Sequence, residues 1–287
     1  MSEGPPLYLV RTYIDARALN IFAAHTGTLD DDLGYALHLA LRRRFGTAAP
    51  QPFRLMEPKV GRPHHPVLLG YAVDLDALAL PPTLPDPGAD WSDDPAPFAI
   101  FPSPFEAKPM PRDWPVGTLL RFEALVRPIR RHGPKARAAR RENDRTDGLG
   151  RSLRTGASER RGSLEFDAYE LAVEGLEHTE SKPSKAEVYI DWFAQRLGNA
   201  AHLHGGGPEL IRFRRSRVLR GAGPAAGTKG VAGRGSGGRG IEGPEALISG
   251  TLRVEDGPAF AKLLARGIGR HRAFGLGMLL LRPGGAA

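Results

Sequence analysis

The sequence predicts an α+β protein, and three observations point to that class. Strand-like stretches alternate with amphipathic helices in the order β-α-β-β, then an uncertain helix and strand, then β-α-β-β-α-β. A hydrophobic share of 41% over 287 residues is enough for one large domain or two ordinary ones. The second half follows the order of a split βαβ unit, and the first half follows it less clearly. We therefore expect two tandem ferredoxin-like domains, residues 1–115 and 116–287.

The expected N-terminal domain begins with a strand over residues 7–15, which is rich in β-branched and aromatic residues. After a polar loop, a helix is expected over about 33–44, with the carboxylates of residues 30–32 at its start and Gly46 at its end. The region 81–115 is too rich in proline for regular structure. The other elements expected here are strands over 53–56 and 67–73 and a short helix over 75–80.

The expected C-terminal domain opens with a strand over 118–126, and a basic insertion follows at about 128–165. Ser184 and Glu187 have the spacing of a capping box, which predicts a helix that continues to about Leu197. The remaining expected elements are strands over 209–220, 246–254 and 278–281, a glycine-rich hairpin tip at about 221–243, and a helix over 258–266 that Asp256 caps.

Positive charge is in excess and unevenly distributed. The formal net charge is +8 and the sequence pI is about 10.0, which is typical of proteins with an anionic partner. Residues 127–161 contain twelve Lys or Arg against four Asp or Glu. Runs of this kind also occur as disordered solubilising insertions, so the charge alone does not decide between the two interpretations.

The residues that the sequence lacks exclude several classes of protein. Without cysteine, the chain has no disulfide, no catalytic thiolate and no cysteine-ligated zinc. The nine histidines form no HExxH pattern, and no GxSxG motif is present, so we expect neither a metal site nor a cofactor. No apolar run approaches the ~20 residues of a membrane span, and the first residues lack the pattern of a signal peptide. The expected location is cytoplasmic.

A glycine-rich stretch over residues 267–277 combines four glycines with Arg270, His271 and Arg272. Glycine permits positive φ and a close approach of the backbone to a ligand. Backbone amides and arginines together suit a phosphate backbone, although the spacing matches neither a dinucleotide fingerprint nor a Walker loop. The alternative is a tight helix-to-strand turn with solvated arginines.

The expected helix over 33–44 has two different faces. Its apolar residues fall on one side, and Tyr35, His38 and Arg42 fall together on the other. This set suits cleavage of RNA by its own 2′-OH, which needs a base, an acid and cations near the phosphorane. Histidine, with an ordinary pKa of ~6.5, can perform either proton transfer, and tyrosine would donate a hydrogen bond. The alternative is a solvated helix face with an incidental histidine.

Apolar residues alternate with arginines in the expected strand over 209–220. At a period of two, Arg212 and Arg214 lie on one face, and Arg215 and Arg217 lie on the other. Neutralising arginines of this strand should weaken binding of a nucleic acid and reduce the salt dependence of that binding.

Four segments of the chain resemble CasE, the CRISPR repeat endoribonuclease of type I-E systems. The resemblance is most specific at the C-terminal segment, residues 260–283, which includes the glycine-rich stretch. Three further segments fit in the same order, namely 35–38, 122–128 and 187–197. The resemblance therefore covers most of the chain, but the long basic stretch and the glycine-rich hairpin tip depart from the family pattern.

The resemblance implies tandem ferredoxin-like domains and metal-independent cleavage of precursor CRISPR RNA at the 3′ base of each repeat hairpin. The products would carry a 2′,3′-cyclic phosphate and a 5′-hydroxyl, and the enzyme would stay with the mature crRNA as a subunit of Cascade. The catalytic groups would be His38, Tyr35 and Arg43, with Arg42 in place of Arg43 if the register is one residue off. The RNA contacts implied by the loop, the helix and a basic β-hairpin are Arg42, Arg212, Arg214, Arg215, Arg217, Arg220, Gly267, Gly269, Arg270, Arg272 and Gly275.

Two other functions fit the same charge. A non-catalytic module that binds an RNA hairpin would need the same fold, although no RNP-like aromatic run appears on a strand. A DNA-binding subunit would place its arginines on the phosphate backbone. The CRISPR repeat endoribonuclease is the main hypothesis, with the repeat hairpin RNA and other Cascade subunits as expected partners.

Overall fold

The computed structural model describes residues 6–26, 28, 33–56, 65–79, 97–131, 165–174, 176, 181–220 and 239–284. The first domain contains an antiparallel sheet of order β2-β3-β1-β4. Its elements are β1 (Tyr8–Tyr13), α1 (Ala16–His25), α2 (Gly34–Phe45), η1 (Gly46–Ala48), β2 (Phe53–Met56), β3 (Val67–Ala72), α3 (Asp76–Ala79), α4 (Pro97–Ile100) and β4 (Glu106–Pro109).

The second domain contains an antiparallel sheet of order β10-β5-β9-β8 and a two-stranded sheet of β6 and β7. Its elements are β5 (Leu119–Val126), β6 (Ile129–Arg131), β7 (Glu165–Asp167), α6 (Ala168–Val173), α7 (Lys185–Leu197), β8 (Ala201–Arg220), β9 (Arg239–Val254), α8 (Gly257–Arg266), η2 (Arg272–Phe274) and β10 (Leu279–Pro283).

Both four-stranded sheets follow the ferredoxin-like plan. In each, the first and third strands are central, the second and fourth are at the edges, and helices fill the two crossovers. The predicted class and the predicted pair of ferredoxin-like units are confirmed.

The expectation of a polar loop after the first strand was wrong, because helix α1 occupies that stretch. Asp15 caps the helix by accepting a hydrogen bond from the Ala18 N–H at 2.8 Å. Leu19 and Phe22, three residues apart, are buried in the N-terminal core. Strand β4 also lies inside the proline-rich region that was expected to lack regular structure. It is an exposed edge strand that is held in place by its pairing with β1, because its own sequence has no strand-forming pattern.

Regular structure enters both ends of the expected basic insertion. Strands β6 and β7 pair with each other and enclose residues 132–164, which lie outside the described residues, as do residues 221–238 of the expected hairpin tip. Helix α7 begins with the predicted capping box, and α8 begins with the predicted Asp256 cap. Strands β8 and β9 are longer than predicted, because β8 continues through a register shift between His204 and Glu209.

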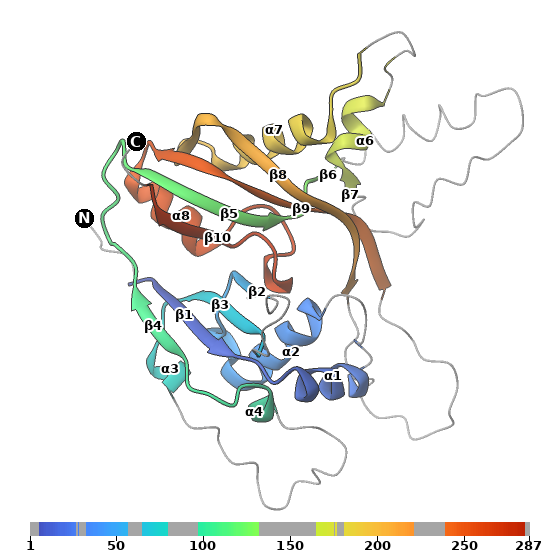
Figure 1. Cartoon of the computed structure of the whole chain (residues 1–287). Coiled ribbons are helices and arrows are strands. Elements are labelled where there is room, and N and C mark those ends of the chain that lie inside the picture. The colour runs from blue at the N-terminus through green and yellow to red at the C-terminus, as the bar shows by residue number, and fades with distance from the viewer. Residues whose placement is uncertain are drawn as a thin grey trace, which may run out of the picture.

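The two domains pack sheet against sheet. Along β1, Val10 belongs to the N-terminal core, whereas its neighbour Leu9 packs against the C-terminal core. The Tyr71 hydroxyl donates to the Leu279 carbonyl at 2.9 Å across this contact. Figure 1 shows the C-terminal sheet above the N-terminal one, with the long β8–β9 hairpin curving down toward α2, which β8 contacts.

Candidate active site and nucleic-acid interface

Helix α2 carries the predicted catalytic pair. Leu37 and Leu41 are buried in the N-terminal core, so the opposite side of the helix carries Tyr35 and His38. The helix ends at Gly46, whose N–H donates to a carbonyl of the last turn, as predicted. Its predicted carboxylate cap at residues 30–32 lies outside the described residues, and the first described residue before the helix makes no side-chain cap.

Phe274 of the glycine-rich loop packs onto this pair. Its ring centroid lies 5.3 Å from that of Tyr35 and 5.6 Å from that of His38, edge-on to both. The rings of Tyr35 and His38 are stacked at 6.3 Å. Tyr35 is only 9% exposed, so a freely solvated helix face, the alternative considered above, is wrong for this side chain. Helix α2 and the glycine-rich loop are therefore in contact, although opposite ends of the chain supply them.

The environment of His38 favours a neutral imidazole. Burial lowers the pKa of His38 below its ordinary value of 6.5, and the positive charge of Arg42 lowers the pKa further. Arg42 lies one turn beyond His38 on the same face. The guanidinium of Arg43 instead lies over the ring of Phe22, 5.0 Å from its centroid. Of the two arginines that the resemblance left open, Arg42 is the one whose charge acts on His38.

The base of the glycine-rich loop is closed by backbone contacts. Gly267 ends α8, and the Ile268 N–H donates to the Gly277 carbonyl at 2.7 Å. Gly269 has φ 75° and lies against Trp192, so that a Cβ at this position would be 2.8 Å from the indole ring. Only glycine fits there without movement of a buried side chain.

A buried carboxylate holds the middle of the loop. Glu165 of β7 places one oxygen 2.8 Å from His271 Nε2 and the other 2.7 Å from Arg270 Nε. The Glu165 and His271 side chains are 5% and 2% exposed. His271 has φ 59°, a left-handed conformation that is unfavourable for a residue other than glycine, and Gly275 on the far side of η2 has φ 84°. The contact with Glu165 therefore stabilises an uncommon backbone conformation at the start of η2.

The predicted RNA-binding arginines of β8 differ in their exposure and in their contacts. The Arg212 and Arg217 side chains are exposed. Arg214 donates from Nε and Nη2 to the two carboxylate oxygens of Glu245, at 2.5 and 3.1 Å, and this carboxylate is only 2% exposed. Arg220 ends β8 opposite Arg239 in the strand register. Arg212 and Arg217 are thus open to solvent, whereas Arg214 stabilises the hairpin through Glu245.

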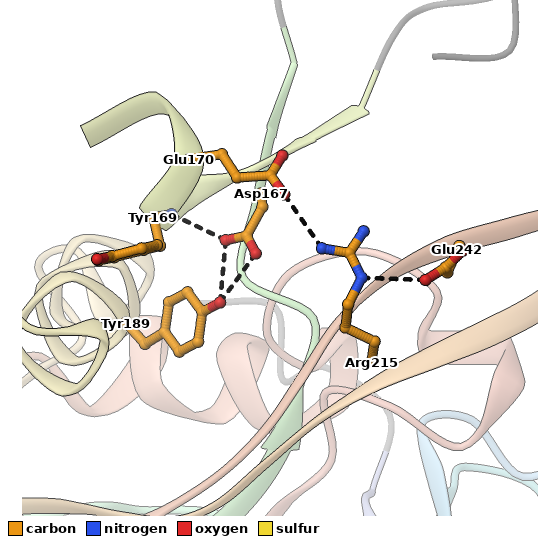
Figure 2. Close-up of polar contacts among 6 residues, drawn as sticks. All are labelled: Asp167, Tyr169, Glu170, Tyr189, Arg215 and Glu242. Atoms are coloured by element: carbon orange, nitrogen blue, oxygen red, sulfur yellow. Dashed lines mark hydrogen bonds and ion pairs between the residues drawn. The ribbon is translucent and has the colours of Figure 1, made fainter. Parts of the chain in front are cut away.

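Arg215 joins the hairpin to helix α6, as Figure 2 shows. Its Nη1 donates to Glu170 of α6 at 3.1 Å, and its Nε donates to Glu242 of β9 at 3.0 Å. Beneath this bridge, the Tyr189 hydroxyl lies 3.0 Å from both oxygens of Asp167, the residue that caps α6. Burial and the charge of Asp167 both raise the pKa of Tyr189, so its hydroxyl remains a protonated donor. The stem of the hairpin is thereby attached to the body of the C-terminal domain.

Within the described residues, no three His, Asp or Glu side chains gather where they could hold a metal ion. None of the helices in the described part of the chain combines the length and the apolar composition that crossing a membrane requires.

Comparison with known proteins identifies the family. A sequence profile of the family described as CRISPR associated protein matches residues 7–283. The chain belongs to the CRISPR associated protein family. No curated protein matches it at a significant level.

Solved CRISPR associated proteins have the same fold as this chain. CRISPR endoribonuclease Cse3 bound to a 19-nucleotide RNA is 17% identical, with 97% of this chain and 100% of that chain covered and a TM-score of 0.54. Cse3 of Thermus thermophilus, bound to an RNA that represents a pre-cleavage complex, gives the same identity, coverage and TM-score. At this level of identity the likeness establishes the fold.

Sequence reasoning missed two residues of the site in this CRISPR associated protein. Phe274 is an apolar residue among glycines and arginines, and that contrast was the signal for a packing contact. Glu165 directly follows the long basic stretch, and only its pairing in β7 brings it to Arg270 and His271. His271, which is not among the predicted catalytic or RNA-contacting residues, fixes the loop through Glu165.

Proposed function

We propose that this CRISPR associated protein is an endoribonuclease of CasE type that cleaves precursor CRISPR RNA at the 3′ base of the repeat hairpin. The observation that carries the proposal is the contact of Phe274 with Tyr35 and His38. It brings a loop suited to a phosphate backbone next to an acid–base pair. Burial and the charge of Arg42 lower the pKa of His38, which suits a general base, whereas a module that only holds RNA needs no acid–base pair.

In the proposed reaction, neutral His38 removes the proton of the 2′-OH just upstream of the scissile phosphate. The 2′-oxygen attacks phosphorus and the bond to the 5′-oxygen breaks. The 5′-oxygen takes up a proton from water, and His38 releases the proton that it accepted to the solvent. The products are a 2′,3′-cyclic phosphate and a 5′-hydroxyl. The Tyr35 hydroxyl donates a hydrogen bond to the phosphoryl group, and the Arg42 guanidinium stabilises the charge that develops on it.

Binding of the hairpin rests on the C-terminal domain. Two exposed arginines of β8, Arg212 and Arg217, contact the phosphate backbone of the stem, and the glycine-rich loop contacts the strand that enters the site. The reaction needs no metal ion, because the attacking oxygen belongs to the RNA and the charges come from side chains. An endoribonuclease of CasE type stays with the mature crRNA, so the other Cascade subunits are the proposed protein partners.

The deciding experiment is incubation of the protein with the repeat RNA of the neighbouring CRISPR array in the presence of EDTA, followed by mapping of the product ends. One cut at the 3′ base of the hairpin, with a cyclic phosphate upstream, is expected. A second RNA with a 2′-deoxy nucleotide just upstream of that bond should remain intact. Binding without cleavage would indicate a non-catalytic RNA-hairpin module, and cleavage of the 2′-deoxy RNA would disprove attack by the 2′-oxygen.

A further inference from the structure

A basic pocket adjoins the glycine-rich loop. It has a volume of about 350 Å³ and lies between α7, the end of α8 and the first half of the loop. Four arginines line it, and we call it the arginine pocket: Arg196, Arg266, Arg270 and Arg272. Among its lining residues are Gly267 to Gly269, but neither Phe274 nor any described residue of α2.

Positive charge in the arginine pocket is largely uncompensated. Only Arg270 is paired, through Glu165, whereas Arg196, Arg266 and Arg272 have no carboxylate within ion-pair distance among the described residues. Arg272 donates to the backbone carbonyl of Arg266 at 2.6 Å, which holds the Arg272 side chain against the end of α8. Burial and then the charges of Arg266 and Arg270 lower the pKa of Arg272, as expected where like charges are crowded.

The chemistry of the pocket selects its ligand. Crowded guanidinium groups repel one another in the free protein, and an anion bound among them removes that cost. Guanidinium groups bind the oxygens of a phosphate through paired hydrogen bonds. A nucleobase is a poor fit, because the indole of Trp192 at the wall is 1% exposed and Arg196 lies over its ring at 5.1 Å. No open aromatic face remains there for stacking.

We propose that the arginine pocket binds a second phosphodiester of the RNA, separate from the scissile phosphate at His38. This inference rests on the proposed function, because it places the same RNA at both positions. The loop from Gly267 to Phe274 would then contact the strand at two points, with the arginine pocket at its beginning and His38 beyond its end. Two fixed phosphates set the position of the strand along the site more tightly than one.

The first test measures binding alone. In a His38→Ala background, the double variant Arg196→Gln/Arg266→Gln is compared with Arg121→Gln/Arg282→Gln, which removes two exposed arginines from paired positions of β5 and β10. Binding of the repeat hairpin RNA is followed by fluorescence anisotropy over a range of KCl concentrations. The pocket variant should bind about tenfold more weakly, and the slope of log K against log salt should fall by about 0.7–0.9, the value for one phosphate contact. The control pair should retain the parent's slope.

The second test locates the phosphate. Each phosphate of the RNA is replaced in turn by a neutral methylphosphonate. One replacement away from the scissile bond should weaken binding to the parent about tenfold and leave binding to the pocket variant unchanged, because the partner of that phosphate is already lost. Circular dichroism and thermal unfolding verify that both variants are folded.

Three results would overturn the inference. In the first, each methylphosphonate replacement changes RNA binding by the same factor in the parent and in the pocket variant. In the second, the pocket variant binds RNA like the control pair but no longer joins Cascade, which would assign the pocket to an acidic protein segment. In the third, the parent protein does not bind the hairpin at all, and the proposed function fails with it.

Discussion

His271 Nε2 lies 2.8 Å from Glu165 Oε2, and this contact joins two segments that are 106 residues apart in the sequence. Glu165 opens β7, the strand that follows the long basic stretch, and His271 opens η2, the turn that places Phe274 against His38. The pair is buried, and the same carboxylate holds Arg270. The position of β7 therefore determines the position of the loop at the proposed active site.

Glu165→Gln should slow cleavage more than it weakens RNA binding. The amide keeps the size of the side chain but loses the charge that holds Arg270, and a hydrogen bond to a charged group contributes about 1.5–3 kcal/mol. We expect a loss of up to about this size in the free energy of unfolding and a single-turnover rate about tenfold lower. Glu242→Gln, at an exposed partner of Arg215, serves as the control. Equal loss of RNA affinity and rate would contradict a positioning role.

His38→Ala should abolish cleavage and leave hairpin affinity nearly unchanged. The imidazole is the proposed base, and proton transfer by a positioned side chain contributes about 10²–10⁴-fold. Single-turnover cleavage and anisotropy binding are measured on the same RNA. A variant that still cleaves at more than about a tenth of the parent rate would remove His38 from the reaction.

The pH profile of cleavage should have its acid limb below pH 6.5. Burial and Arg42 both lower the pKa of His38, and a base acts in its neutral form, so the rate rises with pH to a plateau whose midpoint is the lowered pKa. Arg42→Gln removes the second cause and should move the midpoint upward, though not to 6.5, because burial remains. Arg43→Gln should leave the midpoint in place, since its guanidinium lies over Phe22. A midpoint that moves with Arg43 and not with Arg42 would reverse the assignment.

The same lowered pKa affects stability. Below pH 6.5 the unfolded chain binds the His38 proton more tightly than the folded chain does. The contribution of His38 to the free energy of unfolding is therefore complete above pH 6.5 and is lost as the pH falls through the lowered pKa. His38→Gln should remove this part of the dependence, which urea unfolding at pH 5 and pH 8 can measure.

Arg212→Gln and Arg214→Gln should have different effects although both lie on β8. Arg212 is exposed, so its loss should reduce the salt slope of RNA binding by about 0.7–0.9 without a change in stability. Loss of Arg214 leaves Glu245 as a buried carboxylate without its guanidinium, which should destabilise the fold by about 1–3 kcal/mol. Urea unfolding and anisotropy titrations separate the two effects. Equal unfolding free energies for the two variants would contradict the structural role of Arg214.

Gly243→Ala should destabilise the base of the β8–β9 hairpin. A Cβ there would lie 2.7 Å from Nη2 of Arg127, a residue that is 1% exposed and whose Nη2 donates to the Ser216 carbonyl at 3.1 Å. Overpacking of this kind costs about 1–3 kcal/mol. In an Arg127→Met background the substitution should cost less, because the obstacle is gone. The same cost in both backgrounds would rule out the guanidinium as the obstacle.

Elements with local signals could be predicted from the sequence, and elements defined by distant partners could not. Ser184 with Glu187 and Asp256 mark the starts of α7 and α8, because capping depends on a few neighbouring residues. Strands β4, β6 and β7 are short and gain their order from pairing with other segments. Strand β8 runs through Gly205 and Pro208, which indicate a loop by composition but here accompany a register shift.

The candidate site shows the same limit. Helical periodicity was sufficient to place Tyr35 and His38 on one face, since that relation is local. The contact with Phe274 depends on how two domains pack, and no spacing in the sequence contains that information. The proposal of Arg42 rather than Arg43 rests on the neighbouring helix, because the Arg43 guanidinium lies over the ring of Phe22.

The division of the site between two domains has a consequence for its descent. The groups that would cut RNA belong to α2, whereas the hairpin and the loop that would hold it belong to the other domain. Mutations in α2 can therefore abolish the proposed cleavage without weakening the proposed binding of RNA. In a lineage where another nuclease trims the guide RNA, this protein could be retained only to bind the end of the mature guide. Substitution of His38 would then be the expected sign of that change.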